Sequence, residues 1–269
     1  REQYIAACIE SVLNCKYENI EYIIVDDVSE DSSWDIIQRY AKADSRIRAY
    51  RNEVNQGDYP NRNVALNLAI GEFVKFVDGD DLLYPYALHF FVHYMEQYPK
   101  ATFSLTVAQL SSSSALPRFF QTGEAIHHHY VHQPILFEGP TSSFIRRDAF
   151  HEIGFFSGKR MLGDFEAWHN LNHKGGCLLL PKGSTTFWRE HSNQEMSFHR
   201  DNISFTSAEH LFSKTWLASQ TSQTQDYQPS LAHAKVTFHR WAFFILRTRP
   251  RDFGTIQKMH SLRLWHLIR

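Results

Sequence analysis

Three carboxylates crowd the end of an apolar run in KFVDGDDLLYP, the sequence of residues 75–85. Asp78, Asp80 and Asp81 follow directly on FVKFV, which reads as a strand. Like charges a few ångströms apart raise one another's pKa unless a cation or hydrogen-bond donors compensate. Because Mg²⁺ and Mn²⁺ prefer carboxylate oxygens and keep positions open for phosphate oxygens, the Asp-x-Asp pattern indicates a divalent-cation site.

This cluster has two other possible interpretations. A calcium loop beginning at Asp78 is excluded, because Leu83 stands where it needs glycine and His89 where it needs glutamate. A polar turn, whose carboxylates cap a helix beginning at Pro85, stays open. For an isolated Asp-x-Asp this polar turn is the favoured interpretation, so the surrounding motifs decide.

A second acidic pair, Asp26 and Asp27, also closes an apolar run, IEYIIV. Helical and strand-like patterns alternate around both clusters. The expected helices cover residues 4–13, 31–41, 61–69 and 85–98, the expected strands 20–25, 47–50 and 72–77, and a loop covers 55–60. This alternation predicts an α/β fold with a mostly parallel sheet, which binds ligands beyond the carboxyl ends of its strands.

Composition narrows the class of protein. The chain has 269 residues, 43% of them hydrophobic, and a formal net charge of −1, which excludes a global basic field and disfavours nucleic acid as a partner. Its three cysteines lack CxxC spacing and argue against a disulfide scaffold or zinc ribbon. Four histidines at 127, 128, 129 and 132 have spacing that zinc could use, but a mobile loop is favoured. No apolar run is long enough to span a membrane, and a cytoplasmic location is expected.

Two segments are expected along the chain. Residues 1–200 carry the α/β pattern, and residues 201–269 read as a helical, basic C-terminal extension. This extension either packs on the first domain as a helical hairpin or rests on an anionic membrane at its inner face. The helical-hairpin interpretation is preferred.

Taken together, several segments resemble glycosyltransferase family 2. They are YIAACIESVL (4–13), EYIIVDDVS (21–29), NQG (55–57) with Arg62-Asn63, and GEF (71–73) leading into DGDD (78–81). The resemblance is dense over roughly the first hundred residues and reappears near Asp164. It implies inverting enzymes of the GT-A fold, a mostly parallel central sheet flanked by helices.

The resemblance also implies a donor site and a cation. A nucleotide-sugar donor, expected to be UDP-linked, would contact Asp26, Asp27, Arg62, Asp78 and Asp80. Mg²⁺ or Mn²⁺ would be bound by Asp80 and Asp81, with His191 in the WREH segment as a further ligand. Each residue also has a structural alternative, namely a helix cap for the aspartates, a solvated helix position for Arg62 and a hydrogen-bonded role for His191.

A catalytic base is implied near LGDFEAW (162–168), where Asp164 keeps the place of the carboxylate that deprotonates the acceptor hydroxyl. Gly163 replaces the glutamate that family members usually have before it. Asp164 could also, or only, cap the helix that follows. The acceptor would be a saccharide or a lipid-linked saccharide, in cell-surface polysaccharide or glycan biosynthesis.

One departure from the family lies at the start, because members begin with a strand that this sequence lacks. We interpret the sequence as an N-terminally truncated fragment of a longer protein, since a missing central strand leaves neighbouring strand edges unpaired. A non-catalytic nucleotide-sugar or carbohydrate binding module is the alternative function. A nucleotidyltransferase is weaker, because no Gly-rich triphosphate loop is visible.

Overall fold

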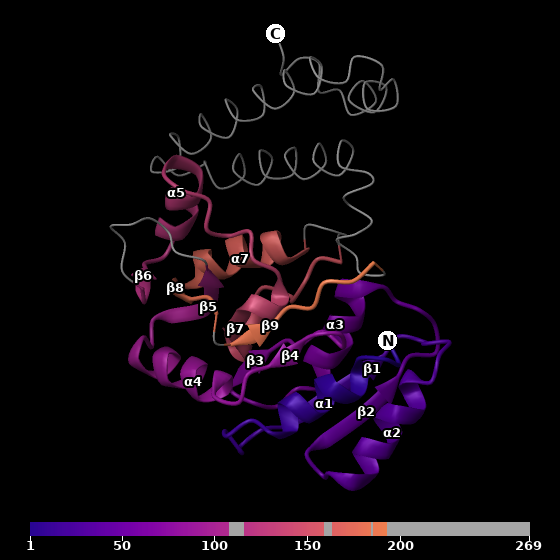
Figure 1. Ribbon diagram of the computed structural model, residues 1–269. Helices are drawn as coiled ribbons and strands as arrows, with labels where there is room; N and C mark the ends of the chain where they lie inside the picture. Colours follow the sequence, from indigo (N-terminus) through magenta and orange to yellow (C-terminus); the bar gives the residue numbers. More distant parts are fainter. Residues whose placement is uncertain (108–115, 159–162, 184, 193–269) are drawn as a thin grey trace, which may run out of the picture. The chain divides into compact units, whose positions relative to one another are not determined.

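The computed structural model describes residues 1–107, 116–158, 163–183 and 185–192 (Figure 1). These residues fall into two compact units. The first unit comprises residues 1–126 and 134–189, and the described part of the second comprises 127–133 and 190–192. The predicted helical extension at 201–269, its membrane contact and the boundary at 200 lie outside the described residues.

The first unit opens with two helices and two strands packed together. They are α1 (Ile5–Leu13), β1 (Tyr22–Asp26), α2 (Ser33–Ala43) and β2 (Ile47–Arg51). In α1 the buried residues Ile5, Cys8, Ile9 and Val12 recur at helical spacing, so one face is apolar and turns inward. Strands β1 and β2 pair in parallel, with Ile24 opposite Ala49, and an isoleucine cluster from α1, α2 and both strands forms their core.

Two further sheets and the remaining helices complete the described chain. In order they are α3 (Asp58–Leu68), β3 (Phe73–Lys75), β4 (Leu82–Leu83), α4 (Ala87–Gln97), β5 (Ala101–Val107), β6 (Arg118–Phe120), α5 (Glu124–Val131), η1 (Pro140–Ser142), β7 (Ser143–Arg146), α6 (Arg147–Glu152), α7 (Gly163–Lys174), β8 (Gly176–Pro181) and β9 (Thr186–Phe187). The larger sheet has five strands in the order β3-β7-β5-β8-β6, and β4 pairs with β9.

The prediction of one mostly parallel sheet is wrong. Only β1/β2 and β5/β8 pair in parallel, whereas β3/β7, β5/β7, β6/β8 and β4/β9 are antiparallel. The reason is that β7, from much later in the chain, lies between β3 and β5, which are nearly consecutive in sequence. Local alternation of helix and strand predicts the elements, but it does not reveal an inserted strand that arrives from a distant segment.

Two smaller expectations also need correction. The segment expected to be a loop at 55–60 is helical from Asp58 onward, because α3 begins there. The helix expected to start at Pro85 begins at Ala87, with Pro85 in the preceding turn. The three cysteines are free and buried. Over the residues that the structure describes, no helix is long and apolar enough to cross a membrane.

Helices α4 and α7 both contact strand β5 of the larger sheet, and α7 also contacts β8. The indole of Trp168 on α7 stacks on Phe103 of β5, with ring centroids 5.6 Å apart, and both side chains are fully buried. Its Nε1 donates a 2.8 Å hydrogen bond to the carbonyl of Glu138. This packing holds α7 in place, and with it the first turn of the helix, where Asp164 lies.

Candidate active site

The acidic turn, residues 78–81, follows β3. The backbone N–H of Asp81 donates to the carbonyl of Asp78 at 2.9 Å, which closes the turn. The side chain of Asp78 is 41% exposed, whereas that of Asp80 is 11% exposed and Asp81 is almost completely buried. The three carboxylates therefore lie within one turn but in different surroundings.

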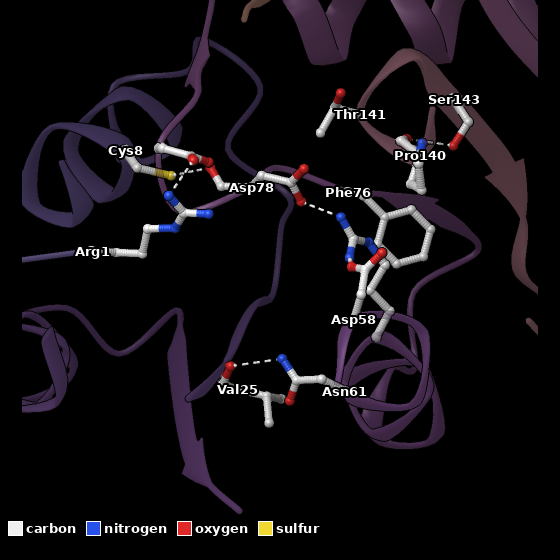
Figure 2. A network of polar contacts seen from close by, with 12 residues as sticks. Arg1, Cys8, Val25, Asp58, Asn61, Phe76, Asp78, Pro140, Thr141 and Ser143 are labelled. Atoms are coloured by element: carbon white, nitrogen blue, oxygen red, sulfur yellow. Dashed lines mark hydrogen bonds and ion pairs between the residues drawn. The ribbon is translucent and has the colours of Figure 1, made fainter. Parts of the chain in front are cut away.

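Three arginines from distant parts of the chain contact this acidic turn. Arg62 on α3 forms an ion pair with Asp78 and another with Asp58. Figure 2 shows the Asp78 carboxylate on the side of Asp58. Arg1 lies 2.9 Å from Asp80 through its Nη1. Arg189, just after β9, donates its backbone N–H to Asp81 at 3.0 Å and its Nε to the Asp80 carbonyl at 2.9 Å.

Asp81 nevertheless keeps an uncompensated carboxylate oxygen. Its Oδ2 is buried and has no hydrogen-bond partner among the residues that the structure describes. Burial raises the pKa of Asp81 to about 7, and the neighbouring charges of Asp78 and Asp80 act in the same direction, opposed by the Arg189 N–H and Lys75. A buried, partnerless carboxylate oxygen beside two further carboxylates is a feature that a bound cation would relieve.

Lys75 at the end of β3 is buried near the acidic turn, and the sequence analysis did not identify it as part of the site. Its Nζ donates to the carbonyls of Phe76, at 3.0 Å, and Thr141, and it lies 5.3 Å from the centroid of the Phe91 ring. Burial lowers the pKa of this lysine to about 7, against the attraction of Asp78 and Asp81. A lysine within the apolar run FVKFV was the available signal, because such a position is normally filled by an apolar residue.

The acidic pair after β1 has a different environment. The Asp27 carboxylate accepts hydrogen bonds from the Asn52 amide at 2.7 Å and from the backbone N–H groups of Gln56 and Gly57, both at 2.8 Å. Gly57 has φ of +84°, a conformation that favours glycine, and this places its N–H toward Asp27. Asp27 thus ties down the loop that leads into α3.

Asp26 is also engaged by the protein. Its Oδ2 accepts from the Ser29 N–H at 3.1 Å and lies 3.1 Å from Nε of Arg51. Between these residues, Val28 has φ of +64°, which is unfavourable for a β-branched side chain. A nucleotide contact by Asp26 or Asp27 stays a prediction, and a structural role for both is visible.

Helix α3 connects the two acidic clusters through neighbouring residues. Asn61 donates to the carbonyl of Val25 in β1 at 3.3 Å and accepts from Asn52 at 2.9 Å, while Arg62 pairs with Asp78 after β3. Figure 2 shows Asn61 directed at Val25 and Asp58 beside Phe76. The two strand ends therefore meet the same helix although β1 and β3 belong to different sheets.

Asp164 lies in the first turn of α7. Its Oδ1 accepts the backbone N–H of Phe165 at 2.7 Å, as expected of a helix-terminal aspartate. Burial raises the pKa of Asp164 to about 6, opposed by the Phe165 N–H, a hydrogen bond from the Tyr59 hydroxyl and the charge of Arg62. Both predicted roles of Asp164, base and helix cap, are compatible with this geometry.

The donor set of the acidic turn fits a hard divalent cation. Among the described residues no three His, Cys, Asp or Glu side chains form a complete metal cage. Mg²⁺ does not require one, because it is usually bound by one or two carboxylates and completes its shell with water and substrate phosphates. Asp80 and Asp81 supply such carboxylates. His191 belongs to the second unit, so its contact with a metal stays a prediction.

The sequence matches a known protein family. The model of the family described as Glycosyl transferase family 2 matches residues 1–154, more than half of the chain. This match contains the acidic turn, Arg62 and both residues of the β1 pair, and it ends before Asp164.

Two curated relatives extend this finding. An uncharacterized glycosyltransferase of Haemophilus influenzae is 25% identical over 210 residues, which are 74% of this chain and 65% of that protein. The UDP-Glc:alpha-D-GlcNAc-diphosphoundecaprenol beta-1,3-glucosyltransferase WfaP of Escherichia coli is 41% identical over 92 residues, which are 34% of this chain and 36% of that protein. The chain thus spans less than two thirds of the length of these relatives.

Solved structures share the fold at low sequence identity. Residues 1–349 of TarS of S. aureus, in complex with UDP-GlcNAc, superimpose with a TM-score of 0.62 at 18% identity, covering 94% of this chain and 72% of that chain. The mannosyltransferase PcManGT of Pyrobaculum calidifontis, in complex with GDP-Man and Mn²⁺, gives a TM-score of 0.64 at 13% identity, covering 100% of this chain and 80% of PcManGT. The expected α/β, GT-A-like fold is confirmed by these structures.

Proposed function

Because the chain belongs to glycosyltransferase family 2, we propose that it transfers a sugar from a nucleotide-diphosphate donor to a hydroxyl acceptor, with inversion at the anomeric carbon. UDP is the favoured nucleotide, since WfaP is named for UDP-Glc and TarS binds UDP-GlcNAc. The diphosphoundecaprenol in the name of WfaP supports a saccharide or lipid-linked acceptor, in cell-surface polysaccharide or glycan biosynthesis.

The observation that carries this proposal is that one helix, α3, contacts two kinds of carboxylate. Arg62 of α3 contacts Asp78 in the acidic turn, and Tyr59, one turn earlier, contacts Asp164. The acidic turn has cationic partners and suits a charged diphosphate with its cation. Asp164 is desolvated and suits proton transfer. The turn proposed to bind the sugar donor and the carboxylate proposed to activate the sugar acceptor thus contact α3 one helical turn apart.

On the donor side, Arg62 is the predicted contact of the diphosphate, and in the free protein its guanidinium pairs with Asp58 and Asp78. Its guanidinium is largely buried, and its Nε has no hydrogen-bond partner among the described residues. A planar, permanently charged fork is suited to phosphate oxygens. Mg²⁺ or Mn²⁺ held by Asp80 and Asp81, with His191 as the further predicted ligand, would act as a Lewis acid that stabilises the leaving diphosphate.

On the acceptor side, Asp164 takes the proton of the attacking hydroxyl. The acceptor oxygen forms its bond to the anomeric carbon as the bond from that carbon to the diphosphate breaks, and the nucleoside diphosphate leaves with the electron pair. Attack opposite to the leaving group inverts the configuration. With a pKa of about 6, the Asp164 carboxyl is ionised at neutral pH yet basic enough to accept a proton.

The role of Asp164 is tested by Asp164→Asn in the full chain, assayed with labelled nucleotide sugars and a mixed acceptor pool. Transfer should fall about 10²–10⁴-fold, the usual contribution of a positioned base. Calorimetric nucleotide binding should be retained, because the acidic turn is unchanged. Glu152→Gln, which alters an exposed carboxylate on α6, is the control and should leave transfer intact. Undiminished transfer by Asp164→Asn would show that another group is the base.

The cation site is tested by Asp80→Ala. Stimulation of donor turnover by Mn²⁺ should be lost or should require much higher Mn²⁺, because one of two predicted carboxylate ligands is removed. Asp35→Ala, which changes an exposed carboxylate of α2, is the control. If turnover of the Asp80→Ala variant responds to Mn²⁺ as the unmodified chain does, Asp80 does not bind the cation.

The second candidate function is a binding module that keeps the scaffold without turnover. Gly163, in place of the glutamate usual in the family, is the feature that favours it. The same assay separates the two functions, because a binding module retains the nucleotide sugar and releases no nucleoside diphosphate. Release of nucleoside diphosphate that depends on an acceptor supports the transferase.

A further inference from the structure

Tyr59 stands in the first turn of α3 with its side chain directed into the protein. Its ring is 5% exposed and packs against Phe156, with centroids 5.0 Å apart. Its hydroxyl donates a hydrogen bond to the carboxylate of Asp164, and burial together with that negative charge raises the pKa of the phenol. Tyr59 therefore stays protonated, and acts as a donor, throughout the neutral range.

Gly163 lies directly against this ring. A Cβ atom added at Gly163 would stand 2.8 Å from Cδ2 of Tyr59 and 2.9 Å from both Cε2 and Cγ, distances that real Cβ atoms do not adopt. The contact is with the rigid body of the aromatic ring rather than the end of a flexible chain. Any residue larger than glycine at this position must displace Tyr59, and with it the hydroxyl that contacts Asp164.

We infer that Tyr59 is a positioning residue for Asp164 and that Gly163 is required to admit its ring. This inference rests on the proposed role of Asp164 as the base. It also accounts for Gly163, which stands where the family usually has glutamate. At the N-terminus of α7, the space beside Gly163 is occupied by the ring of Tyr59 from α3.

Among the described residues, the polar groups that contact Asp164 come from α3 and from its own helix. From α3 it faces Tyr59 and the charge of Arg62, and from its own helix it receives the Phe165 N–H. Glu166, also on α7, is held by the hydroxyl of Ser157. On another side, the chain passes at Gly139, whose added Cβ would lie 4.0 Å from Oδ2 of Asp164. The Tyr59 hydroxyl is thus the uncharged side-chain donor, among the groups named, that fixes the carboxylate.

The test is Tyr59→Phe, which removes the hydroxyl and keeps the packed ring. Because a hydrogen bond to a charged group contributes roughly a tenfold factor, kcat should fall about 10-fold with little change in the donor KM. The acid limb of the pH profile should move upward by about one pH unit, since the lost donor stabilised the ionised carboxyl. An unchanged kcat together with an unchanged acid limb would overturn the inference.

A matched control uses the same change of side chain elsewhere. Tyr94→Phe, on α4, should leave kcat and the pH profile as they are. Gly163→Ala should reproduce the loss seen in Tyr59→Phe, and the double variant should lose little more, because both changes remove one interaction. Additive losses would mean that Gly163 and Tyr59 act separately, against the inference.

A measurement without turnover separates this inference from the proposed function. In the full chain labelled with ¹³C at aspartate carboxyls, the Asp164 resonance is identified by its absence from Asp164→Asn. Its titration midpoint should be higher in Tyr59→Phe than in the unmodified chain, and an unmoved midpoint would refute the contact. Retained transfer by Asp164→Asn, by contrast, would refute the base and leave this titration to decide the contact alone.

Discussion

Asp27 and Asp81 occupy similar places in the sequence, because each is the second of two adjacent aspartates in an acidic cluster that follows an apolar run. Their carboxylates nevertheless differ in their hydrogen-bond partners. Both carboxylate oxygens of Asp27 accept hydrogen bonds, from Asn52, Gln56 and Gly57. Asp81 accepts one, from the N–H of Arg189, and its buried Oδ2 has no partner among the described residues.

The difference teaches how to rank two similar motifs. A carboxylate saturated by protein donors stabilises the fold whether or not a ligand binds, because its charge is already compensated. A buried carboxylate that lacks donors costs stability until something positive arrives. In the free protein, the Asp26-Asp27 pair after β1 therefore has mainly a structural role, and we call it the anchor. The acidic turn is the part that a bound cation would stabilise.

The largest effect is expected at the anchor. Asp27→Ala removes the acceptor of three donors and should lower the free energy of unfolding by about 3 kcal/mol, roughly 1 kcal/mol for each lost hydrogen bond. Guanidinium unfolding measures it. Glu30→Ala, an exposed acid three residues on, should change stability by less than about 0.5 kcal/mol. Equal stability of Asp27→Ala and Glu30→Ala would erase the distinction between the two clusters.

At the acidic turn, a substitution is expected to raise the free energy of unfolding rather than lower it. The pKa of Asp81 is about 7 in the folded protein, above the roughly 3.9 of an unfolded aspartate, so stability is lost as pH rises from about 4 to about 7. In the metal-free protein, Asp81→Asn removes this loss and should raise the free energy of unfolding by on the order of 2 kcal/mol at pH 8.

The same comparison at lower pH sharpens this prediction. Toward pH 4 the gain from Asp81→Asn should shrink, because the folded carboxyl is then already neutral. Glu53→Gln, an exposed acid near α3, serves as the control and should show no such trend. A loss of stability in Asp81→Asn at pH 8 would show that its carboxylate is compensated, contrary to our comparison.

The smallest effect concerns backbone strain beside the anchor. Val28 has φ of +64°, which costs an L-residue about 1 kcal/mol or more, so Val28→Gly should raise the free energy of unfolding by about 0.5 kcal/mol after the lost packing. Val54→Gly makes the same change at an exposed residue without positive φ and should be destabilising. A thermal unfolding series in which both variants lose stability equally would exclude strain at Val28.

Sequence alone was sufficient for the family and for the helices and strands through α4, with the exception of the short strand β4. These depend on local signals, namely the apolar faces of α1 and α4, the apolar run before each acidic cluster, and the ordered motifs that resemble the family. Such signals depend only on residues that are neighbours in the sequence, so they can be recognised without knowledge of the fold.

Tertiary structure alone decided which of these residues already have hydrogen-bond partners in the protein and which do not. The insertion of β7 between β3 and β5, the reach of Arg189 to the acidic turn, the burial of Lys75 and the fit of Tyr59 over Gly163 all join segments far apart in the chain. Burial and hydrogen-bond satisfaction are properties of three-dimensional neighbours, so spacing along the sequence does not reveal them.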